Sequence, residues 1–309
     1  MSVQARTRRR RLGATAVTLA IATLAVTGAA ALPAGAATSG VHPGAGTVHA
    51  VSATAQRATR AFWTQSRMAA ATPVTGNRAG GQVGPPSQIP DPTRFDGVPT
   101  VGALFFTTGT DAHFCTASVV NSLTANLILT AAHCVYGSTY ASNIAFVPMY
   151  HHGQRPYGAW PVESITVAAG WRRSHNQNLD FAFLTVAPPA GTHRPIQFVT
   201  GGLWLGIDQG FAHPIEVIGY NNTGDGPIGC ATASFQVAPR QMKFYCHDFQ
   251  DGTSGGPWIL GYRASNGTGT VFGVVGGHDE GGNYTHSSYS AYFGKLTLRL
   301  FLQAERQQA

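Results

Sequence analysis

The chain has 309 residues, of which 43% are hydrophobic and 11% charged, and its formal net charge is +7. Such a basic balance suggests nucleic-acid binding, but residues 97–309 contain 10 Lys and Arg against 11 Asp and Glu, a net charge of −1. The positive charge therefore belongs to the first 96 residues. The rest of the chain offers no electrostatic case for a nucleic-acid partner.

Residues 1–36 are predicted to be a secretory signal peptide. Five arginines within residues 6–11 precede an apolar run over 12–32, and small residues follow at 34–36. This order is typical of a cleaved signal and argues against a retained membrane anchor, although the apolar run is nearly long enough to cross a bilayer. We therefore expect a secreted, extracellular protein. The paired arginines also resemble a twin-arginine signal, so both export routes stay open.

Residues 37–96 are rich in Ala, Thr, Gly, Pro and Gln, and Phe62-Trp63 is their main strongly apolar site. A segment of this composition cannot bury much of a core by itself. A short helix is expected within 56–71, and residues 80–86 have the composition of a linker. Two interpretations remain open, a flexible leader and a propeptide that is removed on maturation.

Residues 97–309 are predicted to form a single all-β domain that ends in a helix over 295–305. Short runs of β-branched and aromatic residues alternate with Gly, Pro and Asn turns, which is typical of antiparallel strands. The expected strands cover 101–106, 116–120, 127–130, 144–147, 165–167, 181–186, 215–218, 242–245, 257–260 and 271–275.

Two motifs indicate a serine nucleophile. One is Thr-Ala-Ala-His-Cys at 130–134, and the other is Asp-Gly-Thr-Ser-Gly-Gly-Pro at 251–257. A serine hydroxyl is a poor nucleophile at neutral pH, so it needs a histidine as base and a carboxylate that holds this histidine. His133 and Ser254 supply the first two groups. Glycines around Ser254 allow a tight turn that directs the N–H groups of Gly252 and Ser254 toward one point, where an oxyanion can bind.

Asp180 is the candidate for the carboxylate. It lies between the two motifs, directly before the apolar strand expected at 181–186, whose residues can desolvate it. It is expected to accept a hydrogen bond from Nδ1 of His133 and to stabilise the imidazolium. The alternative is an aspartate that only caps a turn.

Four cysteines in an exported chain indicate two disulfides. A metal cluster with His133 or His247 is the alternative, but no metal-binding spacing occurs in the sequence. Neither a metal nor a cofactor is expected.

The His, Asp and Ser motifs, in this order, resemble those of the chymotrypsin-like serine peptidases, in particular a bacterial secreted branch related to the glutamyl endopeptidases. The resemblance covers about residues 98–302. It implies two six-stranded antiparallel β-barrels with a C-terminal helix, and a catalytic triad in the crevice between the barrels. It further implies a trypsin-like serine endopeptidase that acts on polypeptide substrates as a monomer. A catalytically inactive, peptidase-like binding domain is the alternative.

The resemblance also assigns the cysteines. Cys115 and Cys134 match the pair that brackets the histidine loop of the family, which leaves Cys230 and Cys246 to pair with each other. One position departs from the pattern: chymotrypsin-like zymogens usually have Asp before the nucleophile, ready to pair with a freed N-terminal ammonium, but this chain has Thr253. Its oxyanion loop is therefore not expected to depend on a charged N-terminus, although removal of a propeptide could still open the cleft of a zymogen.

The residue preference at the scissile bond stays open. Asp248 precedes Ser254 by six residues, the offset of the acid that binds Arg or Lys side chains in trypsin-type enzymes, but glutamyl endopeptidases can carry Asp there too. Their acid-recognising histidine falls near Val275, which is apolar, and His278 takes that place only if the alignment slips by three residues. Gly276, Gly277 and His278 complete the candidate substrate-binding set. For Asp248 and His278 the alternative is a solvated loop residue.

Overall fold

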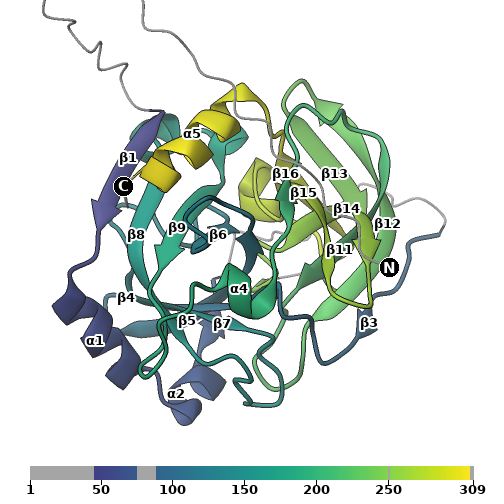
Figure 1. Cartoon of the computed structure of the whole chain (residues 1–309). Helices are drawn as coiled ribbons and strands as arrows, with labels where there is room; N and C mark the ends of the chain where they lie inside the picture. The colour runs from purple at the N-terminus through teal and green to yellow at the C-terminus, as the bar shows by residue number, and fades with distance from the viewer. Residues whose placement is uncertain (1–44, 75–87, 250, 307–309) are drawn as a thin grey trace, which may run out of the picture. The chain divides into compact units, whose positions relative to one another are not determined.

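The computed structural model describes residues 45–74, 88–249 and 251–306, most of which lie in or between β-strands of two sheets (Figure 1). In the first sheet, six antiparallel strands close into a barrel in the order β7-β4-β5-β6-β9-β8, since β8 also pairs with β7. The apolar side chains of these strands are buried and fill the barrel. The strands are β4 (Val101–Thr108), β5 (Asp111–Val120), β6 (Leu127–Thr130), β7 (Ser142–Pro148), β8 (Trp160–Ala168) and β9 (Ala182–Val186).

The second sheet also contains six strands with antiparallel neighbours, in the order β15-β14-β11-β12-β13-β16. Two short strands, β3 (Thr93–Arg94) and β10 (Trp204–Leu205), extend it. The chain directly after β15 contacts β16, where the N–H of Gly276 donates to the carbonyl of Tyr289 at 2.9 Å. The six strands are β11 (His213–Gly219), β12 (Ile228–Ala238), β13 (Gln241–Tyr245), β14 (Pro257–Arg263), β15 (Thr268–Val274) and β16 (Ser287–Ala291).

The expected all-β architecture and terminal helix are confirmed. Helix α5 (Lys295–Glu305) has the predicted bounds and packs on β8 and β9. Each of the ten expected runs overlaps a strand, although Phe181 and Val275 fall just outside β9 and β15; within the two six-stranded sets, β12 and β16 were not predicted. Both are rich in Ala, Ser and other small residues, which have little intrinsic preference for strands. They form because β12 pairs with β11 and β13, and β16 pairs with β13, tertiary interactions that local composition does not reveal.

Part of the segment 37–96 packs against the first barrel. Strand β1 (Gly46–Ala50) pairs with β8, and β2 (Thr72–Pro73) pairs with β5. Between them lie two helices, α1 (Ala53–Phe62) and α2 (Gln65–Ala70), where the sequence predicted one. The helices are separate because Thr64 caps α2 through its hydroxyl, and the preceding Trp63 is only 2% exposed. The barrel thus supplies the core that this segment lacks by itself.

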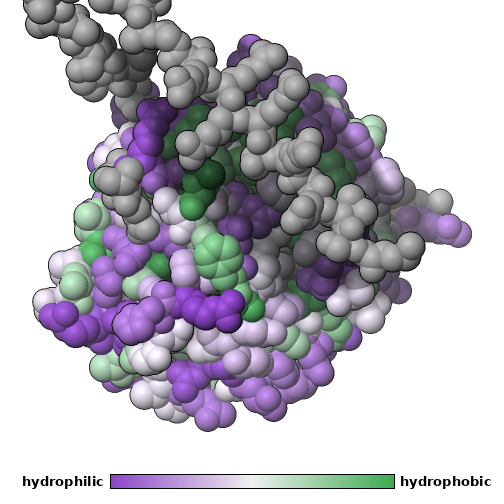
Figure 2. Space-filling view, in the orientation of Figure 1, coloured by the Kyte–Doolittle hydropathy of each residue, from purple (hydrophilic) through white to green (hydrophobic). Residues whose placement is uncertain are grey.

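The remaining short elements are α3 (Ala169–Ser174), η1 (Gln177–Leu179), α4 (Gln197–Thr200) and η2 (His278–Gly281). None of the helices that the structure describes is long and apolar enough to span a membrane. On the face in view, hydrophilic and intermediate residues predominate and hydrophobic residues form small separate groups (Figure 2). The predicted signal peptide and its cleavage site lie outside the described residues, and the proposed domain boundaries stay predictions.

Replacing Trp63 by alanine should destabilise the protein strongly. The indole packs on Phe105 with ring centroids 5.3 Å apart, and its Nε1 donates to the carbonyl of Asn143. Loss of a buried tryptophan typically costs about 3–5 kcal/mol. Denaturant unfolding of Trp63→Ala measures the loss, and Phe198→Ala, which truncates a side chain that is 61% exposed, is the control. Equal stability of the two variants would contradict a structural role for this segment.

Glu216 on β11 should make stability depend on pH. Burial raises the pKa of its carboxyl from 4.5 to about 6. The folded protein therefore ionises less readily than the unfolded chain, so this group lowers stability as the pH rises from about 4.5 through 6. Because the side chain is only partly buried, Glu216→Gln should raise the free energy of unfolding at pH 8 by about 1 kcal/mol at most.

At pH 4 the gain from Glu216→Gln should nearly vanish, because the carboxyl is then mostly protonated in both states. Denaturant titrations at the two pH values measure the difference. Asp111→Asn, at an exposed strand end, is the control. A gain of the same size at both pH values would show that the effect is not one of ionisation.

Candidate active site

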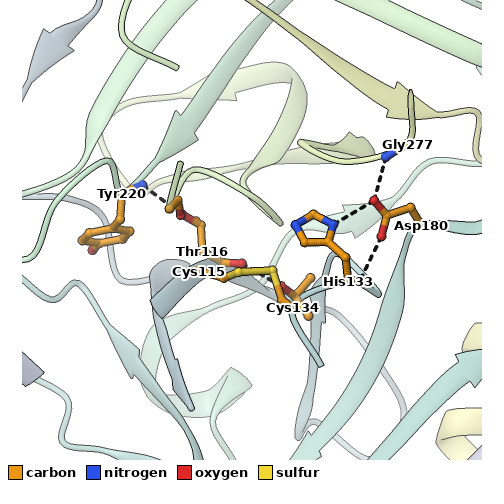
Figure 3. The surroundings of a disulfide bond; sticks show 9 residues. Cys115, Thr116, His133, Cys134, Asp180, Tyr220 and Gly277 are labelled. Carbon is orange, nitrogen blue, oxygen red and sulfur yellow. Dashed lines mark hydrogen bonds and ion pairs between the residues drawn. A yellow bond between two sulfur atoms is a disulfide. The ribbon is translucent and has the colours of Figure 1, made fainter. Parts of the chain in front are cut away.

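Asp180 is fully buried between Leu179 and Phe181, just before β9. Its Oδ2 accepts a hydrogen bond from Nδ1 of His133 at 2.8 Å and another from the N–H of Gly277 at 2.9 Å (Figure 3). Its Oδ1 accepts the backbone N–H of His133 at 2.9 Å. A buried carboxylate is costly unless donors satisfy its oxygens, and these three donors do so. The contact that the sequence predicted between Nδ1 and the carboxylate is present.

His133 lies on the turn after β6, and its side chain is 4% exposed. Because Nδ1 donates to the carboxylate, Nε2 is the ring nitrogen that is left to accept a proton. The residue borders a cavity of about 320 Å³, whose lining also includes Val74, Phe106, Tyr136 and Glu280. The cavity is large enough for a side chain of a bound peptide.

Ser254 is 2% exposed and lies on the tight turn between β13 and β14. Gly252 and Gly255 adopt φ values of +90° and +81° on either side of it. A Cβ on Gly255 would lie 2.2 Å from the carbonyl oxygen of Thr116, and one on Gly252 would lie 2.6 Å from that of Tyr220. Only glycine therefore fits these positions, where the turn presses against the first barrel.

The backbone of this turn has a defined orientation. The carbonyl of Thr253 accepts the N–H of Gly256 at 2.8 Å. Because the N–H and C=O of one peptide unit point in opposite directions, the N–H of Ser254 points away from this bond. Within the described ranges, the N–H groups of Gly252 and Ser254 donate to no carbonyl or side chain. Both N–H groups are available to bind an anionic oxygen.

The serine turn and the histidine turn are close neighbours. The N–H of Thr116 donates to the carbonyl of Ser254 at 2.7 Å, and a Cβ on Gly255 would lie 3.0 Å from the nitrogen of Ala131. The hydrogen bonds found among the described residues include two from His133 to Asp180 and none of the Ser254 hydroxyl. Hydrogen bonds therefore define the contact of His133 with Asp180, whereas the contact of Ser254 with His133 rests on the proximity of the two turns.

Both disulfides have the pairing that the resemblance implies. Cys115 is bonded to Cys134 and Cys230 to Cys246, with Cα–Cα distances of 6.3 Å and 6.7 Å. Cys115, His133 and Cys134 have potential metal-binding atoms within 4.8 Å of one another. The two sulfurs are bonded to each other, however, so neither is the thiolate that a metal site would need. The first disulfide instead anchors the turn that carries His133 (Figure 3).

The four candidate substrate-binding residues separate into two groups. Gly276 and Gly277 are buried beside the catalytic candidates, and the N–H of Gly277 donates to Asp180, a role that the sequence did not predict. Asp248 and His278 are exposed. Asp248 has φ +60°, and Nδ1 of His278 lies 3.0 Å from Oε1 of Gln177. Their exposure favours the solvated-loop alternative for these two side chains.

The sequence motifs did not identify Thr116 as a residue of the site. Its hydroxyl is buried between the serine turn and the second sheet, where it contacts Gly252 and Tyr220. One signal was available: a polar residue directly after Cys115, within an otherwise buried strand, needs internal hydrogen-bond partners. The sequence does not say which partners these are.

Comparison with known proteins agrees with the fold. Three solved structures are similar: the protease Anisep from Arthrobacter nicotinovorans (24% identity, TM-score 0.62, covering 70% of this chain and 99% of that one); the thermostable serine protease AL20 from an extremophilic microorganism (24%, 0.60, 67% and 97%); and a Glu endopeptidase in complex with MPD (17%, 0.54, 71% and 98%). No curated protein matches the chain.

The family model Trypsin matches residues 91–295, which is about two thirds of the chain. This range includes both sheets except β1 and β2, and it contains His133, Asp180 and Ser254. The chain belongs to the trypsin family and is a chymotrypsin-like serine peptidase.

Proposed function

We propose that the protein is a secreted endopeptidase that hydrolyses peptide bonds through Ser254, His133 and Asp180. The observation that carries the proposal is the buried Asp180 carboxylate with His133 on Oδ2, beside a serine turn whose two N–H groups are available. Two disulfides support export, since such bonds persist in oxidising compartments. The leader, with a signal peptide followed by a propeptide, belongs to the same proposal.

In the proposed mechanism, Ser254 Oγ attacks the carbonyl carbon of the scissile bond while its proton moves to Nε2 of His133. The Asp180 carboxylate stabilises the resulting imidazolium, and the N–H groups of Gly252 and Ser254 bind the oxyanion. The imidazolium then gives its proton to the leaving amine, and an acyl ester remains on Ser254. Water hydrolyses this ester by the same steps, with His133 again as base.

An inactive peptidase-like binding domain is the second candidate. The observation in its favour is that the Ser254 hydroxyl takes part in none of the hydrogen bonds found among the described residues, because an active serine must come within hydrogen-bond reach of His133. Such contacts are often long in the absence of substrate and shorten in the complex.

Labelling with a fluorophosphonate separates the two candidates, because only an activated serine reacts quickly. The wild type should label within minutes, whereas Ser254→Ala should not label. His133→Ala should lower kcat by on the order of 10⁶, and the double variant should lose scarcely more, since the two residues act as a unit. Folded wild-type protein that does not label, or a Ser254→Ala variant that labels equally, would exclude the enzyme.

Replacing Asp180 by asparagine should lower kcat by about 10⁴, because an amide cannot hold the same histidine tautomer or stabilise the imidazolium. Steady-state kinetics on a peptide substrate measures the loss. Asp251→Asn, which changes another acid near the serine, is the control and should retain most of the activity. A larger loss of kcat in Asp251→Asn than in Asp180→Asn would refute the assignment of the triad.

Substrate preference is tested through Asp248. If its carboxylate contacts the side chain before the scissile bond, substrates with Arg or Lys there should be preferred, and Asp248→Ser should abolish that preference. Because the side chain is exposed, we expect a small effect instead, worth about 1 kcal/mol or less. Profiling both proteins on a mixed peptide library decides between these outcomes. Wild-type cleavage after Glu would favour the preference named for the similar Glu endopeptidase.

A further inference from the structure

Thr116 connects the serine turn to both strand sets. It lies in β5 directly after Cys115 and is fully buried. Its hydroxyl donates to the carbonyl of Gly252 at 3.0 Å and accepts the N–H of Tyr220, just after β11, at 2.9 Å. Figure 3 shows the second of these bonds, with Thr116 between the disulfide and Tyr220. One side chain thus joins the first barrel, the second sheet and the loop that bears the proposed nucleophile.

The backbone of Thr116 contributes as well. Its N–H donates to the carbonyl of Ser254 at 2.7 Å, and its carbonyl accepts the hydroxyl of Thr130 at 2.8 Å. The carbonyls of Gly252 and Ser254, on either side of Thr253, therefore both accept hydrogen bonds from Thr116. The carbonyls of Gly252 and Ser254 point into the first barrel, so Thr116 helps to determine which groups of the turn face the substrate.

The hydroxyl bond acts on a glycine of the turn. Gly252 has φ +90° and no Cβ, so no side chain of its own limits its torsions, and the partners of its peptide groups help to restrain them. Its carbonyl lies between the two N–H groups that are proposed to bind the oxyanion. A bond to this carbonyl limits rotation about ψ of Gly252 and so fixes the orientation of one N–H relative to the other.

Chymotrypsin-like zymogens usually have an Asp before the nucleophile that can pair with a freed N-terminal ammonium. Thr253 occupies that position here, and it is buried against Gly219, where an added Cβ would lie 2.8 Å from the Cβ of Thr253. A threonine cannot pair with an ammonium. The hydroxyl of Thr116 is a neutral group that restrains the turn through its hydrogen bond to the carbonyl of Gly252.

We propose that Thr116 is a positioning residue: its hydroxyl holds Gly252 in the conformation that forms the oxyanion site, without a charged N-terminus. The inference rests on the proposed function, because it assumes that Gly252 and Ser254 bind an oxyanion. It predicts that loss of the hydroxyl weakens the transition state more than it weakens substrate binding.

The test compares Thr116→Val, which keeps the shape and removes the hydroxyl, with Thr116→Ser, which keeps the hydroxyl. Thr100→Val is a matched control: Thr100 is also fully buried, and its hydroxyl also donates from the first barrel to a glycine carbonyl, that of Gly267. Three quantities are measured for each protein: kcat and KM on a peptide substrate, the inhibition constant of a peptide aldehyde, and the melting temperature. Ser254 Oγ adds to the aldehyde carbon while its proton moves to Nε2 of His133, and the former carbonyl oxygen then occupies the oxyanion site as the alkoxide of the hemiacetal.

We expect Thr116→Val to lower kcat by about 10- to 100-fold, less than the ~10²–10³-fold loss on removal of an oxyanion donor. KM should change little, and the aldehyde should bind more weakly by the same factor as kcat/KM. Thr116→Ser should retain most of the activity. Thr100→Val should lower the melting temperature as Thr116→Val does but keep kcat and the aldehyde affinity. If Thr116→Val does not fold, Thr116→Ala compared with Thr116→Ser gives the same contrast.

A Thr116→Val enzyme with normal kcat and aldehyde affinity overturns the inference, as does a Thr100→Val enzyme with the same catalytic loss. Neither result affects the proposed function, which the fluorophosphonate labelling of the wild type and of Ser254→Ala tests separately. If the wild type does not label, the proposed function fails first, and the positioning role of Thr116 fails with it.

Discussion

The buried negative charge of Asp180 is the constraint on which the arrangement of the site depends. A carboxylate that is removed from water must be matched by donors, and here the donors come from both strand sets. His133 follows β6 of the first barrel, and Gly277 follows β15 of the second sheet. The two sheets are therefore joined at the point where the proposed chemistry takes place. The same bonds select the histidine tautomer that leaves Nε2 to accept a proton.

The serine turn is held differently, by neutral hydrogen bonds and close glycine contacts. Each such bond contributes only about 1 kcal/mol, but together they fix a loop in which glycine residues would otherwise rotate freely. Thr116 takes part in several of them, and the adjacent Cys115–Cys134 bond ties the same strand to the histidine turn. Closing a loop of that length stabilises by about 3 kcal/mol in the chain-entropy model. The disulfide and the hydrogen bonds thus restrain the histidine and serine turns from one strand.

The segment that precedes the family match extends the same barrel. Strand β1 covers the edge of β8, and Trp63 fills space beside Phe105. The segment continues to Val74, which lines the cavity next to His133. A leader that contributes buried side chains differs from a loosely attached tail, because its removal exposes apolar surface of the barrel.

The sequence by itself determined the strand-rich class, the terminal helix and the family, and it predicted the contact between His133 and Asp180, because these depend on local patterns and on short motifs with few chemical meanings. It did not predict β12 and β16, which are rich in small residues and become strands through pairing with β11 and β13 in one case and with β13 in the other. The tertiary structure alone decided that Gly277 donates to Asp180, that Asp248 is exposed and that Thr116 reaches Gly252. The contact of Gly277 with Asp180 joins residues 97 positions apart, and that of Thr116 with Gly252 joins residues 136 positions apart. Such distant pairings leave no local signature in the chain.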